Sequence, residues 1–229
     1  MNCSTLERHI FNFTHPATGE IWMLHRVVEQ RSEKPEQREL EVTPDWLEEK
    51  ILEYKKKGYT FVPISRMPNI GKWVCVTFDD GYRDSFTHAL PLMKLLDVPF
   101  TVYVTTGFID NQMPMWWYPD EKLGISTQEL LLLDSEPLCT IGAHTVSHPK
   151  LDTLDRSKQY HEISASCQQL EDLLHHPVEH FSLPHGAYSG DTIEICQELE
   201  LQTVVTSWGG HVRQRKKYLP YPRINIVQP

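Results

Sequence analysis

The feature that most constrains the fold is a series of short apolar runs, rich in β-branched and aromatic residues, that alternate with helical patterns. Such runs between helices are typical of βα units around a parallel sheet covered on both faces. No glycine-rich dinucleotide fingerprint follows any run, which disfavours an open nucleotide-binding sheet. We therefore expect an α/β protein, a (β/α) barrel with seven or fewer repeats. The runs are EIWMLHRVV (20–28), YTFVPI (59–64), KWVCVTF (72–78), FTVYVTT (100–106), PLCTIGAH (137–144), HFSL (180–183) and QTVVTS (202–207).

Two segments have the pattern of amphipathic helices. Thr43 can cap the first helix, and Pro44 suits its first position. The second, DRSKQYHEISASCQQLEDLL, has apolar residues at steps of three and four and is stopped by Pro177. The inner face expected for this second helix consists of Tyr160, Ile163, Cys167, Leu170 and Leu174.

Length and composition favour a single domain and exclude some functions. A chain of 229 residues can bury one large core. With 22 Lys and Arg against 31 Asp and Glu, its net charge of -9 disfavours nucleic-acid binding, which needs clustered basic surface. No apolar run approaches the roughly 18 residues that indicate a membrane span. The five cysteines form no C-x-x-C pair, so neither a disulfide framework nor a thiolate zinc site is expected.

The start of the chain bears on its location. Residues 1–19 lack a basic segment followed by an apolar one, so no secretory signal is evident and we predict a cytoplasmic protein. We assign 1–19 to an N-terminal extension and 20–229 to the barrel domain. The basic run RQRKKY (213–218) could contact an anionic ligand such as a diphosphate.

Polar residues follow several of the predicted strands. Barrel enzymes collect their catalytic groups at the carboxyl ends of the strands. Asp79 and Asp80 follow the run VCVTF, HTVSH follows LCTIGA, PHG follows HFSL, and His25 lies within WMLHRV. These strand ends are therefore where we expect the functional site.

Two histidines and a carboxylate could form a metal site. If the chain turns helically after IGAH, His144 and His148 lie on one face at a spacing suited to one metal ion. One carboxylate would complete a three-ligand set with open positions for water and substrate. Of the paired aspartates, one could then bind metal while the other accepts a proton from water. The alternative is that the Asp-Asp-Gly sequence caps a helix starting near Tyr82.

Three motifs in order carry a resemblance to a known family. TFDDG (77–81), HTVSH (144–148) and FSLPHG (181–186) resemble the motifs of the NodB-like polysaccharide deacetylases of carbohydrate esterase family four. The resemblance covers roughly 20–227 and includes the HRV, WWY and YPRINI segments of a bacterial branch. It implies a deformed (β/α) barrel and zinc-dependent removal of N-acetyl groups from amino sugars. It also implies that Asp79 is the general base and that Asp80, His144 and His148 are metal ligands.

The chain departs from the family pattern in its supporting residues. Ser182 stands where the family often has an arginine that steadies the catalytic aspartate, and Arg223 could approach from the last strand instead. The family's last histidine, which protonates the departing amine, is missing. His25 is the leading substitute for this acid, and His211 is the second choice.

The expected substrate-binding residues follow from the same resemblance and from aromatic composition. His185 occupies the place of a family residue whose backbone N–H helps to hold the developing oxyanion, a role that needs no particular side chain. Two others are paired tryptophans, whose flat faces suit sugar rings although such pairs also serve in packing. The set is His185, Trp116, Trp117 and Arg223.

Together these features predict a metal-dependent deacetylase acting on an N-acetylated sugar in a glycan, a lipid-linked oligosaccharide or a surface-polysaccharide precursor. The expected cofactor is a divalent metal, with zinc preferred, and the protein could contact a lipid-linked substrate peripherally. Two alternatives stay open. One is a carbohydrate-binding relative without catalysis, and the other is a hydrolase of another amide, such as a cyclic ureide or formyl group.

Overall fold

The computed structural model describes residues 19–119, 121–212 and 220–229 of the chain. The predicted N-terminal extension and the basic run 213–218 therefore lie outside the described residues, apart from Gly19. None of the helices in the described ranges is long and apolar enough to cross a membrane.

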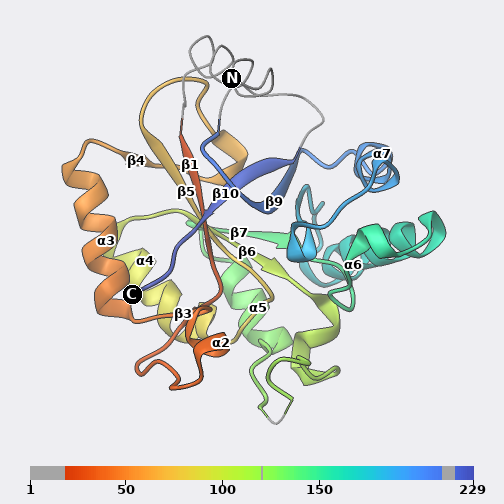
Figure 1. The fold of residues 1–229 in the computed structure, drawn as a ribbon, viewed down its shortest axis with the longest axis horizontal. Coiled ribbons are helices and arrows are strands. Elements are labelled where there is room, and N and C mark those ends of the chain that lie inside the picture. The colour runs from red at the N-terminus through yellow and green to blue at the C-terminus, as the bar shows by residue number, and fades with distance from the viewer. Residues whose placement is uncertain (1–18, 120, 213–219) are drawn as a thin grey trace, which may run out of the picture.

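Seven parallel strands close into a barrel, which confirms the predicted fold class (Figure 1). The ring closes because β1 pairs with β10 on one side and with β5 on the other. Its strands are β1 (Glu20–Leu24), β5 (Trp73–Phe78), β6 (Phe100–Val104), β7 (Cys139–Ala143), β8 (His180–Ser182), β9 (Thr203–Gly209) and β10 (Tyr221–Asn225).

Two of the expected strands are shorter than the sequence suggested. The run YTFVPI yields only β4 (Thr60–Phe61), which pairs with the start of β5. The run EIWMLHRVV is divided after β1, and its second part forms β2 (Arg26–Val27), which pairs with β3 (Glu41–Val42) in a separate sheet. This break places His25 at the end of a barrel strand and not within one.

Helices surround the strands in Figure 1. They are α2 (Pro35–Arg38), α3 (Pro44–Lys56), α4 (Leu90–Leu96), α5 (Thr127–Asp134), α6 (Arg156–Leu174) and α7 (Gly190–Glu198). Shorter helical turns are η1 (Ile64–Arg66), the π-helix η2 (Ser85–Ala89), η3 (Thr106–Asn111), η4 (Leu151–Thr153) and η5 (Pro184–Gly186).

Alternation along β5 determines which side chains enter the barrel. Trp73 and Cys75 belong to one core cluster, whereas Val74 and Val76 belong to the larger cluster shared with the helices. Because side chains alternate between the two faces of a strand, the inward row continues through Thr77. The next residue in that row is Asp79, so the strand delivers a carboxylate to the mouth of the barrel.

The two predicted helices are present. Thr43 caps α3, since its side chain accepts a hydrogen bond from the Trp46 N–H at 3.4 Å. The inner face of α6 contains Ile163, Cys167, Leu170 and Leu174, all of which are buried.

The prediction that Tyr160 belongs to the inner face of α6 is wrong, because this residue is 45 % exposed. Gln159 is buried in its place at 2 % exposure. Its amide donates to the Leu154 carbonyl at 2.9 Å and its carbonyl accepts from Thr192 of α7, so a polar residue is satisfied there.

Truncating the inner face of α6 should destabilise the barrel. Ile163 has no exposed surface, so Ile163→Ala should lower the free energy of unfolding by about 2–5 kcal/mol. Tyr160→Ala on the outer face should change it by only about 0.5 kcal/mol. Chemical denaturation of both variants measures the difference. Equal losses would contradict the packing described for α6.

Candidate active site

The two aspartates lie at the carboxyl end of β5, where the backbone turns sharply. The Asp79 N–H donates to the Leu24 carbonyl at 2.9 Å, which extends the pairing of β1 with β5 by one residue. Asp80 and Gly81 then adopt left-handed conformations, with φ of 74° and 76°. A Cβ on Gly81 would also come within 3.0 Å of Val104, so glycine suits both the conformation and the space.

The alternative reading of the aspartates as helix caps does not match this geometry. The first helical segment after them, η2, begins at Ser85 with Asp84 as its N-cap. The side chains of Asp79 and Asp80 instead contact groups from other strands and loops.

Asp79 is held by a buried bidentate ion pair. Arg223 of β10 donates from Nη1 to Oδ1 at 2.7 Å and from Nη2 to Oδ2 at 2.6 Å. Ser182 adds a hydrogen bond from Oγ to Oδ2 at 3.2 Å. Although burial opposes ionisation, the guanidinium of Arg223 lowers the pKa of Asp79, and His144 lowers it further when protonated. Asp79 is therefore kept as a carboxylate.

The structure places Arg223 where it can replace the arginine that the family motif often has. Its side chain has no exposed surface. Arg223 is also predicted to bind substrate, but this fully buried guanidinium behind Asp79 is placed to support that carboxylate and not to contact a substrate.

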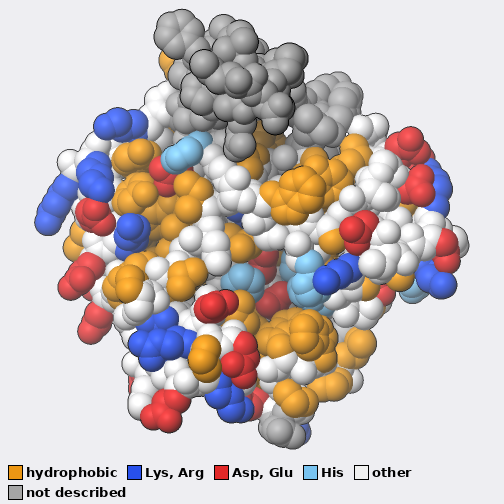
Figure 2. Space-filling view, viewed as in Figure 1, with side chains coloured by type: hydrophobic (Ala, Val, Ile, Leu, Met, Phe, Trp, Pro, Cys, Tyr) orange, Lys and Arg blue, Asp and Glu red, His pale blue; other side chains and the backbone are white. Residues whose placement is uncertain are grey.

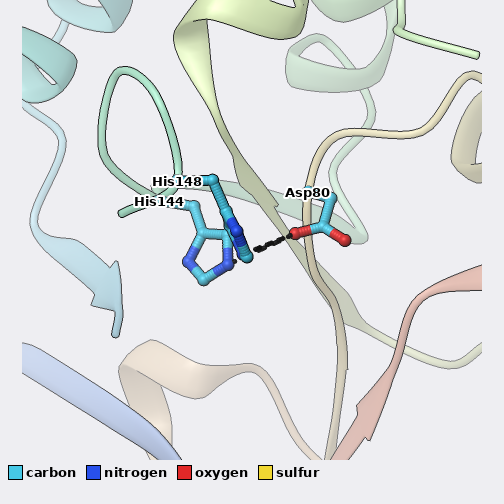
Figure 3. Close-up of side chains that lie close together, drawn as sticks. All are labelled: Asp80, His144 and His148. Carbon is cyan, nitrogen blue, oxygen red and sulfur yellow. Dashed lines mark ion pairs between the residues drawn. The ribbon is translucent and has the colours of Figure 1, made fainter. Parts of the chain in front are cut away.

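Asp80, His144 and His148 converge on one point (Figure 3). The Oδ1 atom of Asp80 lies 3.4 Å from His144 Nε2 and 3.3 Å from His148 Nε2. Three ligand atoms, one from each residue, lie within 4.8 Å of one another. The sequence therefore identified correctly which side chains come together.

The conformation expected for the histidine segment is wrong. Residues 144–150 form no helix, and both Thr145 and His148 are left-handed, with φ of 67° and 60°. The two imidazoles meet because this loop folds back on itself and not because they share a helix face. Spacing alone could not distinguish these two arrangements.

The three residues have the chemistry of a divalent metal site. A carbonyl can only accept, so the 2.7 Å contact between His144 Nδ1 and the Ser182 carbonyl requires a proton on Nδ1. The Nε2 lone pair is then directed toward Asp80, as in the hydrogen-bonded histidines of zinc sites. Among the described residues, buried Asp80 Oδ1 has no hydrogen-bond partner. A cation such as zinc would satisfy it.

The charges within this group reinforce one another. Burial alone would raise the pKa of Asp80, but His148 and His144 lower it well below its usual range. Burial would lower the pKa of His144, yet the Asp79 and Asp80 carboxylates raise it. Asp80 is therefore kept as a carboxylate, the form that can bind a cation.

His25 lies beside the aspartates, immediately after β1. Burial lowers the pKa of its imidazole, while the Asp80 and Asp79 carboxylates partly oppose this. Its neighbour Arg26 is fixed by Asp84 at 2.9 Å and by Glu41 at 3.3 Å. The second candidate, His211, instead lies 3.5 Å from Glu20 at the start of β1.

Aromatic rings form a wall beside His148. The ring of Trp117 lies 5.0 Å from the His148 ring, and its Nε1 donates to the Tyr82 hydroxyl at 2.5 Å. The ring of His185 lies 4.6 Å from that of His148 and is stacked with Trp116 at 6.5 Å. Trp116 is 66 % exposed, so one of its faces is available to a ligand.

A second aromatic pair was not singled out as a site from the sequence. Trp208 is 61 % exposed, and its ring lies 5.4 Å from that of Tyr188. Its backbone N–H donates to Thr206 Oγ1, which itself donates to the Gly186 carbonyl of η5. Figure 2 shows apolar surface on two sides of a hollow in which Asp or Glu and His side chains are visible.

Two further supporting contacts were also not expected. The Ser182 hydroxyl donates a hydrogen bond to Asp79, and the Ser182 carbonyl accepts one from His144. Thr77 accepts a hydrogen bond from Arg223 Nη1 at 3.0 Å. The inward alternation of β5 could have indicated Thr77, whereas nothing in the local sequence marks the dual role of Ser182.

Comparisons with known proteins point to one family and one fold. A family model described as polysaccharide deacetylase matches residues 66–204. A candidate polysaccharide deacetylase of Bacillus subtilis (strain 168), YxkH, is 24 % identical over 213 residues, covering 92 % of this chain and 72 % of its own length. Similar folds include a deacetylase of Streptococcus pyogenes, PplD, solved with acetate, at a TM-score of 0.76, 24 % identity and 93 % coverage of both chains. IcaB of Ammonifex degensii has a TM-score of 0.76 at 20 % identity, again with 93 % coverage of both chains.

Breaking the buried ion pair should be costly. Arg223→Met leaves the Asp79 carboxylate buried and unpaired, so it should lower the free energy of unfolding at neutral pH by about 3–5 kcal/mol. Since the pKa of folded Asp79 is lowered, the wild-type stabilisation is present above 3.8, the usual pKa of this carboxyl, and is lost as the pH falls below it.

The double variant Asp79→Asn/Arg223→Met is the control, because it removes both charges. It should lose less stability than the two single variants summed, as measured by denaturation at neutral pH. Strict additivity would show that the two groups are not coupled.

Proposed function

We propose that this chain, which belongs to the polysaccharide deacetylase family, is a metal-dependent enzyme that removes an N-acetyl group from an amino sugar. Members of this family are hydrolases that act on amide bonds of N-acetylated glycans. The observation that carries this proposal is that two adjacent carboxylates have different partners. Asp80 faces His144 and His148, whereas Asp79 is held ionised by Arg223.

In this proposal Asp80, His144 and His148 hold a divalent cation, with zinc preferred. When bound, the cation lowers the pKa of water and polarises the amide carbonyl. Asp79 accepts the proton of the attacking water, and its lowered pKa keeps it ready to do so at neutral pH. The two adjacent carboxylates thus have different tasks because their surroundings differ.

The departing amine needs a proton, and we assign its delivery to His25. This imidazole adjoins Asp79 and Asp80, whose charges act on it. Since burial lowers its pKa, the protonated form is favoured on the acidic side of neutrality. The remaining route is return of the proton by Asp79 itself.

The walls of the pocket suit a sugar. The backbone N–H of His185 is our candidate for holding the developing oxyanion, because η5 brings this residue against His148. The exposed face of Trp116 is suited to the apolar face of a sugar ring, and Trp117 supports it.

The substrate class within this family is also a proposal. Apolar surface on two sides of the hollow (Figure 2), together with the exposed rings of Trp116 and Trp208, favours a glycan or an oligosaccharide precursor over an isolated small amide. Cytoplasmic location and peripheral contact with a lipid-linked substrate stay predictions from the sequence. Carbohydrate binding without catalysis, and hydrolysis of a ureide or formyl group, are outcomes that the same assay separates.

The direct test is acetate release from N-acetylglucosamine oligosaccharides by zinc-loaded protein. Asp79→Asn should lower the turnover rate by a factor of about 10²–10⁴ while zinc stays bound, because it removes the base and leaves the three metal ligands in place. His144→Ala should instead lose zinc, measured by elemental analysis. The matched control is Asp97→Asn, at an exposed left-handed helix end, which should leave both readouts unchanged.

Each unexpected result has a distinct meaning. Glycan binding without acetate release would support the non-catalytic alternative. Release of formate, or opening of a cyclic ureide, with no release of acetate would support the other amidase. A folded wild-type protein that binds no divalent metal would contradict the proposed mechanism.

The role of His25 predicts a pH dependence. Burial lowers the pKa of His25 below 6.5. Because the imidazolium is lost as the pH rises through this pKa, the turnover rate should decline as the pH rises. His25→Gln should remove this decline and lower the rate on the acidic side by a factor of about 10²–10⁴. A pH-rate profile of both proteins measures it. An unchanged profile in His25→Gln would assign proton delivery to Asp79.

A further inference from the structure

The loop that presents His144 and His148 is held by hydrogen bonds to Glu162 of α6, which lies outside the family's motifs. We infer that Glu162 is a positioning residue for the metal site. This inference rests on the proposed function, since it concerns the affinity of the same three ligands for a cation.

The histidine loop is not held by its own conformational preference. Thr145 and His148 are β-branched or bulky residues with positive φ, a region that such residues rarely adopt. Residues of this kind persist only where surrounding contacts determine the backbone. The site therefore depends on whatever holds this loop.

Glu162 supplies such contacts. Its Oε2 accepts hydrogen bonds from the backbone N–H groups of Val146 and Ser147, both at 2.9 Å. Its Oε1 accepts from Ser147 Oγ at 2.6 Å. Two adjacent N–H groups and one hydroxyl thus converge on one half-buried side chain. A carboxylate is suited to this position because it only accepts and because its charge strengthens each bond.

The other side of the loop is fastened to η3. The Thr106 N–H donates to the Thr145 carbonyl at 3.1 Å, and the Gly107 N–H donates to the Val146 carbonyl at 2.9 Å. Glu162 fixes the N–H groups while η3 fixes the carbonyls. The backbone between the two histidines is consequently held from both sides.

These contacts also affect His148, one of the proposed metal ligands. The His148 N–H donates to Thr145 Oγ1 at 3.0 Å, so the orientation of His148 depends on the turn that Glu162 stabilises. Glu162 adjoins Ile163, which is fully buried, so α6 offers a rigid support. Loss of the carboxylate should free His148 to move away from Asp80.

Zinc affinity tests this inference, measured on the whole protein by competition with a chelator of known affinity. Glu162→Gln should weaken zinc binding by a factor of about 10–100, the usual effect of removing a group that orients a metal ligand. It should also alter the visible spectrum of the Co²⁺-substituted protein. Asp172→Asn is the matched control, because this carboxylate lies exposed on α6 and bonds only to Gln168 among the contacts described for it.

The outcomes separate orientation from general stability. A folded Glu162→Gln protein with unchanged zinc affinity and an unchanged Co²⁺ spectrum would overturn the inference, even if it melted at a lower temperature. If that variant does not fold, Ser147→Ala decides, since it removes one of the three bonds and should weaken zinc binding by less than about tenfold. Unchanged affinity there would also overturn the inference. Absence of zinc binding by the wild type would overturn the proposed function and this inference together.

Discussion

The ion pair between Arg223 and Asp79 lies where the barrel closes and is also part of the candidate active site. Arg223 comes from β10 and Asp79 from the end of β5, and β1 lies between these two strands. The guanidinium also donates to the Thr206 carbonyl of β9 and to Ser182 of β8. One buried side chain of β10 therefore connects β5, β8 and β9. Removing either charge of the ion pair would leave the other desolvated without a partner.

This pairing explains how two adjacent aspartates can both be ionised. Like charges side by side normally raise the proton affinity of one another. Here Asp79 is neutralised by a guanidinium from inside the barrel, whereas Asp80 is turned by its left-handed backbone toward two imidazoles. These different environments fit the different roles proposed for the two carboxylates, and separating environments is a recurring way to divide acid and base functions.

Local pattern predicted the barrel, and together with the resemblance to the family it predicted that Asp80, His144 and His148 come together. Strand-length runs and the polar groups at strand ends depend on neighbours in sequence. The conformation of the histidine loop did not follow from spacing, because Glu162 and η3 impose it from distant segments. Tyr160 was misplaced for a similar reason, since a buried amide at Gln159 is acceptable only once Leu154 and Thr192 satisfy it.

The site also depends on a second cluster of charges that lies outside its ligands. Arg26 pairs with Asp84 and Glu41, and its guanidinium lies 5.4 Å from the ring centre of Tyr82 and 5.0 Å from that of Tyr118. His25 precedes this arginine, and the Tyr82 hydroxyl accepts from Trp117 in the aromatic wall. The proposed proton donor and the proposed sugar-binding surface thus share one support. A change in Arg26 would therefore alter the contacts beside both of these parts of the site.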